Sequence, residues 1–166
     1  MLSLPQLIQE DVDLFDLALG ELIAKSEATA ALIIDKGGPL IAQKGDTENL
    51  ETMSIAALAA GSYAATQEIA KRVGESDFSS IYQQGQNFSV LVNNIDEALL
   101  LIVIFPASLS VGAVKYYATT TLEQVAAQIR RAHERAPDTS LDLVSMNLLD
   151  TTDVFRRPGE SPEEAK

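Results

Sequence analysis

The chain has no cysteine, no tryptophan and a single histidine, and aromatic residues make up only 5% of its 166 residues. Without cysteine it can form no disulfide, no thiol nucleophile and no thiolate metal site. The one histidine, His133, has no partner in the sequence that would complete a catalytic triad or a metal site. We therefore interpret His133 as a surface residue.

Positive charge is also scarce, because 12 Lys and Arg oppose 24 Asp and Glu and leave a net charge of −12. Nucleic acids and anionic membranes are bound through clustered Lys and Arg, so neither is expected as a partner. The longest apolar run, residues 98–105, is far shorter than the ~20 residues that span a bilayer. Residues 1–24 carry five acids and no Lys or Arg, which is unlike a targeting peptide. We expect a cytoplasmic protein.

Motifs that bind phosphate or support catalysis are missing as well. Lys44 precedes Gly45 in the one segment that combines glycines, a lysine and a threonine, so the segment fails the phosphate-loop pattern, and no G-x-G-x-x-G occurs. The acids show neither a metal-ligand spacing nor a pair that can be placed in one cleft. The sequence therefore predicts no catalytic residue, no cofactor, no metal, and no enzyme acting alone.

A helix rich in small residues is predicted over residues 50–72, which contain no proline. At helical spacing, the strip expected to sit on a sheet consists of Ile55, Leu58, Ser62, Ala65 and Ile69. A second strip, with almost no side-chain bulk, consists of Ser54, Ala57, Gly61, Ala64 and Glu68. A third, also slender, consists of Met53, Ala56, Ala60, Tyr63 and Gln67.

Gly61 in the interior of this helix costs about 1 kcal/mol relative to alanine, which suggests that something packs against it. Two interpretations stay open. The helix is squeezed into its own core, or it pairs with a copy of itself or docks a partner.

The rest of the chain supplies two further helices and five strands. Helices are predicted over residues 5–25, with an acidic solvated face, and over residues 110–135. A hairpin is expected from residues 30–35 and 40–42 around a glycine-containing turn. Asp46, Thr47 and Asn49 are alternative caps for the small-residue helix, and Gly74 is expected to close it.

Three strands follow the small-residue helix in a meander. Residues 78–84 have two polar faces, which favours a sheet edge whose free backbone can accept another chain. Residues 88–93 alternate as in a half-buried strand, and residues 99–105 are apolar throughout, as in a central strand. An acidic tail follows Pro137. We expect one domain over residues 1–136 and a partly disordered tail, residues 137–166, in which residues 140–155 are dispensable for folding and modulate partner affinity.

The order helix, hairpin, small-residue helix, meander and helix resembles the Roadblock/dynein light-chain family and, within it, the MglB-like bacterial regulators of a Ras-like GTPase. The resemblance covers about residues 5–136. It is carried by AALIIDKGGPLIAQKGD (residues 30–46), IAALAAGSYAATQEIAKRVGE (55–75), FSSIYQQG (78–85) and LLLIVIFPASLSVGAVKYYA (99–118).

The resemblance implies an α/β, profilin-like fold, in which a five-stranded antiparallel sheet has one helix on one face and two on the other. It also implies a homodimer with a continuous ten-stranded sheet. The implied dimer interface consists of Ala56, Ala60, Tyr63, Phe78, Ser80, Ile81 and Tyr82. The implied platform for the GTPase consists of Ala57, Gly61 and Ala64, with Ser54 and Glu68 at its margins.

The leading hypothesis is a homodimeric regulator that binds a Ras-like small GTPase and acts as its GTPase-activating protein, without inserting an arginine. Arg72, Arg130, Arg131 and Arg135 are the candidates for such an inserted arginine, but a helix-dipole role explains them more simply. One alternative is a scaffold dimer that leaves GTP hydrolysis unchanged. Another is a small-molecule sensor, which would need a polar pocket inside the core. A gene for a Ras-like GTPase beside this one would favour the first hypothesis.

Overall fold

One antiparallel sheet, with strand order β2-β1-β5-β4-β3, organises residues 4–135, the part of the chain that the computed structural model describes. The strands are β1 (Ala30–Asp35), β2 (Leu40–Gly45), β3 (Ser80–Gln84), β4 (Phe88–Asn94) and β5 (Leu99–Pro106). The uniformly apolar β5 is central and β3 lies at an edge, and both placements were predicted. The predictions about residues 137–166 lie outside the described residues.

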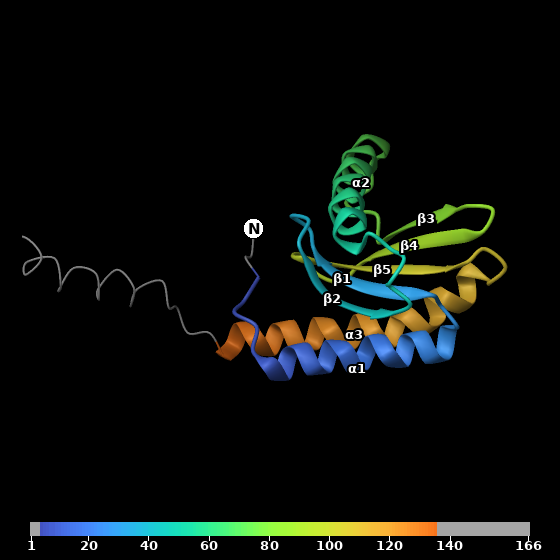
Figure 1. The fold of residues 1–166 in the computed structure, drawn as a ribbon. Coiled ribbons are helices and arrows are strands. Elements are labelled where there is room, and N and C mark those ends of the chain that lie inside the picture. The colour runs from blue at the N-terminus through green and yellow to red at the C-terminus, as the bar shows by residue number, and fades with distance from the viewer. Residues whose placement is uncertain (1–3, 136–166) are drawn as a thin grey trace, which may run out of the picture. The chain divides into compact units, whose positions relative to one another are not determined.

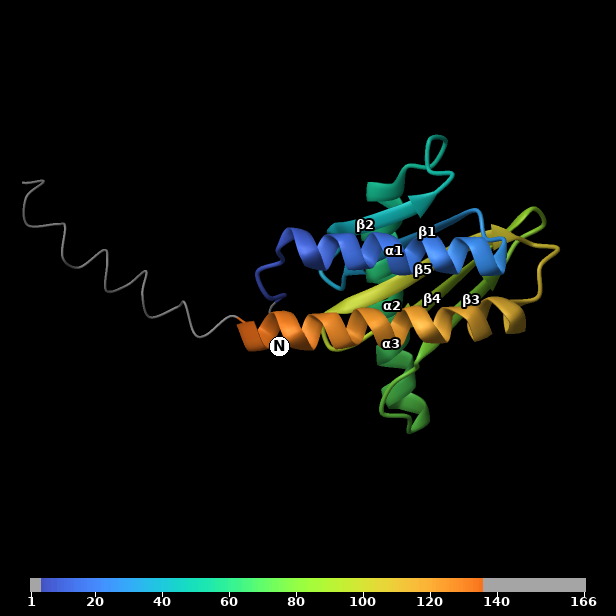
Figure 2. The ribbon, with the colours of Figure 1, turned by 90° about the horizontal axis from the view of Figure 1, so that it is seen from below.

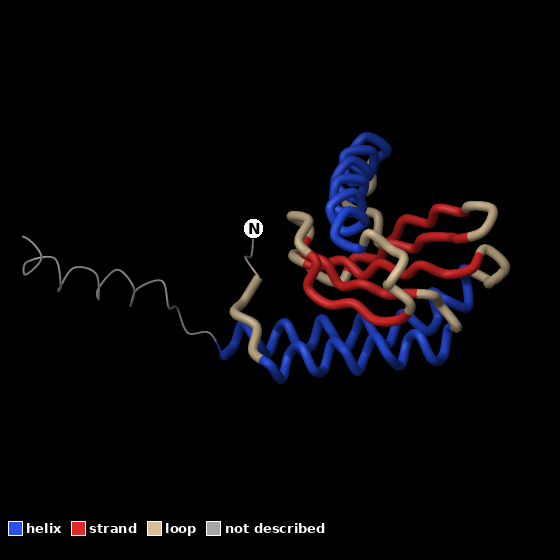
Figure 3. Tube along the Cα trace, in the orientation of Figure 1, coloured by secondary structure: helices blue, strands red, loops and turns tan. Residues whose placement is uncertain are grey.

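Helices cover both faces of this sheet (Figure 1). They are α1 (Gln9–Ser26), α2 (Thr52–Val73) and α3 (Val111–Arg135). α1 and α3 run side by side on one face, and α2 lies on the other (Figures 2 and 3). This arrangement confirms the predicted fold class for the single chain. No helix within the described range is both long and apolar enough to cross a bilayer.

The side chains of β5 alternate between two apolar clusters, one under each helical layer. Leu99, Leu101, Val103 and Phe105 pack with α1 and α3. Leu100, Ile102 and Ile104 pack on the side of α2. On one flank β5 pairs with β1, where Ala30 lies opposite Ile104, and on the other with β4. Because both faces of β5 are covered, the strand needs no polar side, which explains its sequence.

Asp11 corrects the expectation that the acids of the first helix simply face solvent. Its side chain is fully buried and accepts a hydrogen bond from Gln128 Nε2 of α3 at 2.7 Å. Its other oxygen accepts the Ile8 backbone N–H at 2.8 Å, in the manner of a helix cap. α1 therefore begins at Gln9, later than the predicted start at Pro5.

The ends of α2 are confirmed in part. Gly74 closes the helix in the left-handed conformation, with φ 85°, as predicted. At the start, the N-cap is Glu51, which makes no side-chain capping bond, so none of the three predicted caps holds that position. The helix begins at Thr52, two residues later than predicted.

Candidate functional site

α2 buries a different strip of residues from the one predicted. Its buried residues are Ala56, Ala60, Tyr63 and Ala70. In the strip that was expected on the sheet, Leu58 is 74% exposed and Ile69 is 55% exposed. The physical reason lies in the sheet, whose large side chains Ile34, Leu100 and Ile102 fill the contact with α2. The helix meets them with Ala56, Ala60 and Tyr63, and its large aliphatic side chains remain outside.

Three residues of the predicted dimer interface belong to this buried strip. Ala56, Ala60 and Tyr63 are buried against the sheet of their own chain, so their contribution to an interface would be through packing beneath it. The other predicted interface residues belong to β3 and to the residues just before it. Phe78, Ser80 and Ile81 are half-buried, and Tyr82 is exposed. Their role in a dimer remains a prediction.

The predicted docking strip faces solvent. Its members are all exposed: Ser54, Ala57, Gly61, Ala64 and Glu68. A Cβ added to Gly61 would meet nothing within 4 Å, so no part of the described chain packs against this glycine. The interpretation of this strip as core is wrong. Docking onto it stays a prediction.

Large apolar side chains extend this exposed surface in both directions along α2. Met53 is 78% exposed near the start of the helix, and Val73 is 64% exposed in its last turn. Together with Leu58 and Ile69, they add four large exposed apolar side chains to a strip that also carries the polar Ser54 and Glu68. Exposed apolar surface marks interaction sites in many folded proteins. We call it the outer face of α2: the docking strip together with Met53, Leu58, Ile69 and Val73.

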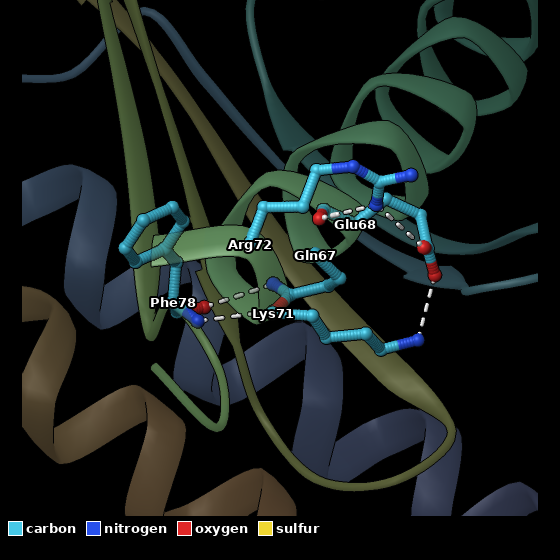
Figure 4. Close-up of polar contacts among 5 residues, drawn as sticks. All are labelled: Gln67, Glu68, Lys71, Arg72 and Phe78. Atoms are coloured by element: carbon cyan, nitrogen blue, oxygen red, sulfur yellow. Dashed lines mark hydrogen bonds and ion pairs between the residues drawn. The ribbon is translucent and has the colours of Figure 1, made fainter. Parts of the chain in front are cut away.

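A group of charges lies at the C-terminal end of this face (Figure 4). The Glu68 carboxylate accepts hydrogen bonds from Lys71 Nζ at 2.6 Å and from Arg72 Nη1 at 3.5 Å. The hydrogen bond and the charge of Lys71 lower the pKa of Glu68. These side chains are exposed, so the ion pairs add little to stability. The Arg72 guanidinium also donates to the Glu68 carbonyl, so it lies along its own helix.

Gln67 joins α2 to the residues that lead into β3, a contact that sequence analysis missed (Figure 4). Its Nε2 donates to the Phe78 carbonyl at 3.1 Å, and its Oε1 accepts the Phe78 N–H at 3.0 Å. The Tyr63 hydroxyl is 3.2 Å from the same carbonyl and 3.2 Å from Asp77 Oδ1. No local sequence pattern predicts these hydrogen bonds, because the partners are more than ten residues apart.

Lys36 completes the polar contacts on this side of the sheet. Its Nζ donates to the Asp96 carbonyl at 2.7 Å and lies 5.4 Å from the centre of the Tyr63 ring. Burial lowers the pKa of Lys36, although Asp77, Asp96 and Glu97 oppose the shift. Burial also raises the pKa of Tyr63, and Asp77 adds to the effect. The Tyr63 hydroxyl therefore remains a neutral hydrogen-bond donor.

A hollow of about 280 Å³ lies at His133, lined mainly by the β4–β5 turn and the second half of α3. His133 Nδ1 is 3.0 Å from the Ile129 carbonyl one turn earlier in its own helix. Ligand pockets usually measure roughly 300–1,000 Å³, so the hollow is small for one. Residues 4–135 contain no cluster of three or more His, Cys, Asp or Glu that could hold a metal.

Known structures resemble this chain closely in fold. MglB of Myxococcus xanthus is 26% identical with a TM-score of 0.72, over 76% of this chain and 96% of that one. A gliding protein MglB from Thermus thermophilus is 27% identical with a TM-score of 0.72, over 79% and 99%. An MglB described with a tetrameric arrangement is 27% identical with a TM-score of 0.74, over 80% and 99%. No curated protein matches.

The profile of the Roadblock/LC7 domain matches residues 14–105. These residues run from within α1 through α2 and the whole sheet almost to the end of β5. They include both the outer face of α2 and the edge strand β3. The match thus covers more than half of the chain and the site described above, and the chain belongs to the Roadblock/LC7 domain family.

Proposed function

We propose that this chain forms a homodimer that binds a Ras-like small GTPase through the outer face of α2 and acts as its GTPase-activating protein. One observation carries the proposal: Gly61 sits in mid-helix, and beyond the backbone of its own helix nothing in the described chain lies within 4 Å of an added Cβ. A residue that weakens the helix without serving its own core is best explained by a partner's close approach. Similarity to MglB structures supports the same assignment.

The chemistry of the surface fits positioning better than direct catalysis. The outer face of α2 offers mainly backbone, small side chains and aliphatic groups, and Glu68 is its one charged member. The nearby Arg72 lies along the same helix and donates to the Glu68 carbonyl and carboxylate. A regulator of this kind would accelerate hydrolysis by fixing the GTPase's own groups in place, since positioning alone can lower an activation barrier by several kcal/mol.

The experiment places an arginine in the docking strip. Gly61→Arg and Ala57→Arg should abolish GTPase binding, because steric blockage and an unpaired interfacial charge cost several kcal/mol. The matched control is Ala113→Arg on α3, where alanine is also exposed but lies in the other helical layer. Binding is measured by pull-down with the GTPase loaded with GTP or GDP, and hydrolysis by phosphate release.

Thermal melts and sizing accompany each variant. A folded Gly61→Arg protein that binds normally would contradict docking at this strip. Binding that never accelerates phosphate release would favour the scaffold function instead. Loss of binding in the Ala113→Arg control would move the docking surface to the layer of α1 and α3.

A further inference from the structure

The free edge of the sheet at β3 presents three residues whose backbone groups point outward. Asn94 N–H donates to the Ser79 carbonyl and Gly85 N–H to the Phe88 carbonyl, so Ser79 and Gly85 face β4. Residues along a strand alternate in the direction of their backbone groups. Ile81 and Gln83 therefore also bond β4, and the N–H and C=O groups of Ser80, Tyr82 and Gln84 point away from the sheet.

By the same alternation, the backbone groups of Phe78 would continue this outward row. Gln67 already occupies them, because its side-chain amide bonds both the Phe78 N–H and the Phe78 carbonyl. An amide that donates and accepts in this way imitates one residue of a neighbouring strand. The outward backbone groups of Phe78 are thus unavailable to another strand. β3 starts at Ser80, although the sequence pattern begins at Phe78.

The two edges of the sheet differ in how they are protected against pairing. The hairpin that carries edge strand β2 has a register irregularity between Ile33 and Ile34, and β2 itself carries Lys44. Both are devices that discourage edge-to-edge association. Edge strand β3, SIYQQ, has no charge, no proline and no irregularity in its pairing with β4. In a chain of net charge −12, a neutral strand is the segment best suited to meet a second copy of itself.

In the proposed homodimer, β3 joins β3 of a second copy in the continuous ten-stranded sheet that the family resemblance implies. We infer that the two strands pair with Tyr82 opposite Tyr82 on the two-fold axis, and that Gln67 sets this register by occupying the backbone groups of Phe78. The inference rests on the proposed homodimer and adds its register and a positioning residue. With Tyr82 at the centre, Ser80 faces Gln84 of the copy, and every outward group of the strand finds a partner.

A competing register shows what the Gln67 contact changes. If the two-fold axis passed through Ile81, Ser80 would face Tyr82, and Gln84 would face Phe78 of the copy. When the backbone groups of Phe78 are free, that register pairs more residues than the Tyr82 register does. When Gln67 holds Phe78, the groups of Gln84 stay unpaired, and unpaired backbone groups in an interface are costly.

The aromatic side chains agree with the Tyr82 register. The Tyr82 ring stacks on Phe105 with centroids 6.3 Å apart and planes 10° from parallel. Tyr82 is nevertheless 37% exposed, so one side of the stack is open. On a two-fold axis through Tyr82, two such stacks would lie side by side, and neighbouring aromatic pairs across strands are favourable.

Introduced cysteines test the register, because the chain has none of its own. Opposed residues that exchange hydrogen bonds have Cα atoms about 5.5 Å apart, within the range that a disulfide spans, while diagonal neighbours are about 7–8 Å apart. Under mild oxidation, Tyr82→Cys should cross-link with itself faster than Ile81→Cys. With Gln67→Met added, Ile81→Cys should cross-link faster than Tyr82→Cys. The Phe78 N–H is then no longer bonded by Gln67, and the Phe78 carbonyl can accept a bond from the second copy beside the one from Tyr63.

Gln43→Met on the exposed part of β2 is the matched control and should leave the order unchanged. The same order in the Gln67→Met background as in the original one would overturn the role of Gln67. Faster cross-linking of Ile81→Cys in the original background would overturn the register. A sized dimer that cross-links at neither position would overturn pairing through β3 but leave the proposed regulator standing, whereas a monomer would overturn both.

Amide exchange of the unaltered chain decides the register even if Gln67→Met fails to fold. In the Tyr82 register the amides of Ser80, Tyr82 and Gln84 should all be protected in the dimer. Fast exchange at Gln84 beside protected Ser80 and Tyr82 would indicate the Ile81 register and contradict the inference.

Discussion

At the scale of single residues, buried or half-buried polar side chains tie together elements that are distant in sequence. Asp11 links the start of α1 to Gln128 of α3, and Gln67 links α2 to Phe78. Each of these side chains fills two hydrogen-bonding roles at once. Removing one of them therefore leaves more than one partner group unsatisfied, and a buried group without its bond costs about 1–3 kcal/mol.

Asp11→Ala should lower the free energy of unfolding by about 1–3 kcal/mol, because Gln128 Nε2 and the Ile8 N–H lose their acceptor. Asp13→Ala is the matched control, since the Asp13 carboxylate is exposed and accepts from Gln9. Urea denaturation of both variants measures the difference. Equal effects would mean that the buried contact adds nothing.

Tyr63 should make stability fall at alkaline pH. Its pKa in the folded protein is raised above the ordinary value of 10.0 by burial and by Asp77. Above about pH 10 the unfolded chain releases the hydroxyl proton of Tyr63 while the folded chain keeps it. Raising the pH therefore stabilises the unfolded state relative to the folded one, and the free energy of unfolding falls. The slope of unfolding free energy against pH above about pH 10 should be steeper in the original chain than in Tyr63→Phe. Parallel slopes would contradict the shift.

At the scale of elements, α2 shows where prediction from the sequence stops. The existence and order of all elements, the central place of β5, the edge place of β3 and the closure at Gly74 followed from local patterns. The buried face of α2 did not. Its apolar residues occur all round the helix, and choosing the strip with the largest aliphatic side chains assumed that these are buried. The strands supply most of the bulk at this contact, and α2 meets them with Ala56, Ala60 and Tyr63.

The candidate site was predictable to a similar degree. The exposed strip around Gly61 was among the strips read from helical spacing, and the structure shows that it faces solvent. The contribution of Leu58 and Ile69 to the same face was missed because they were assigned to the sheet. Gln67 was missed because its partner is a backbone group in another element, and backbone groups carry no sequence signal.

The same substitution at two positions of α2 tests which side is buried. Ala60→Leu should lower the free energy of unfolding by about 1–3 kcal/mol, because it overpacks the contact with the sheet. Ala64→Leu, one turn later and exposed, should change it by less than about 0.5 kcal/mol. Urea denaturation compares the two. A larger loss at Ala64 would place the docking strip in the core after all.

At the scale of the whole molecule, the net negative charge opposes self-association. Two copies bring together two chains of net charge −12 each, so their mutual repulsion opposes the proposed dimer. The surfaces assigned to the interface are therefore neutral or apolar. Electrostatics would control how tightly the dimer forms, and it would not specify where.

Added salt should strengthen the dimer. Screening shortens the reach of the repulsion to about 10 Å at 0.1 M and about 3 Å at 1 M ionic strength. The dissociation constant measured by analytical ultracentrifugation should fall as sodium chloride is raised over this range. A rise would indicate an interface held by ion pairs, which the neutral strand β3 does not provide.

The pairing of β1 with β5 also shapes how the chain folds. Ala30 and Ile104 lie opposite each other, while β2, α2, β3 and β4 all lie between them in sequence. The β1–β2 hairpin and the β3–β4–β5 meander close short loops and can form early. The contact between β1 and β5 must close a long loop, and contacts between residues far apart in the sequence slow folding. We therefore expect the seam between these two central strands to be the last part of the sheet to form.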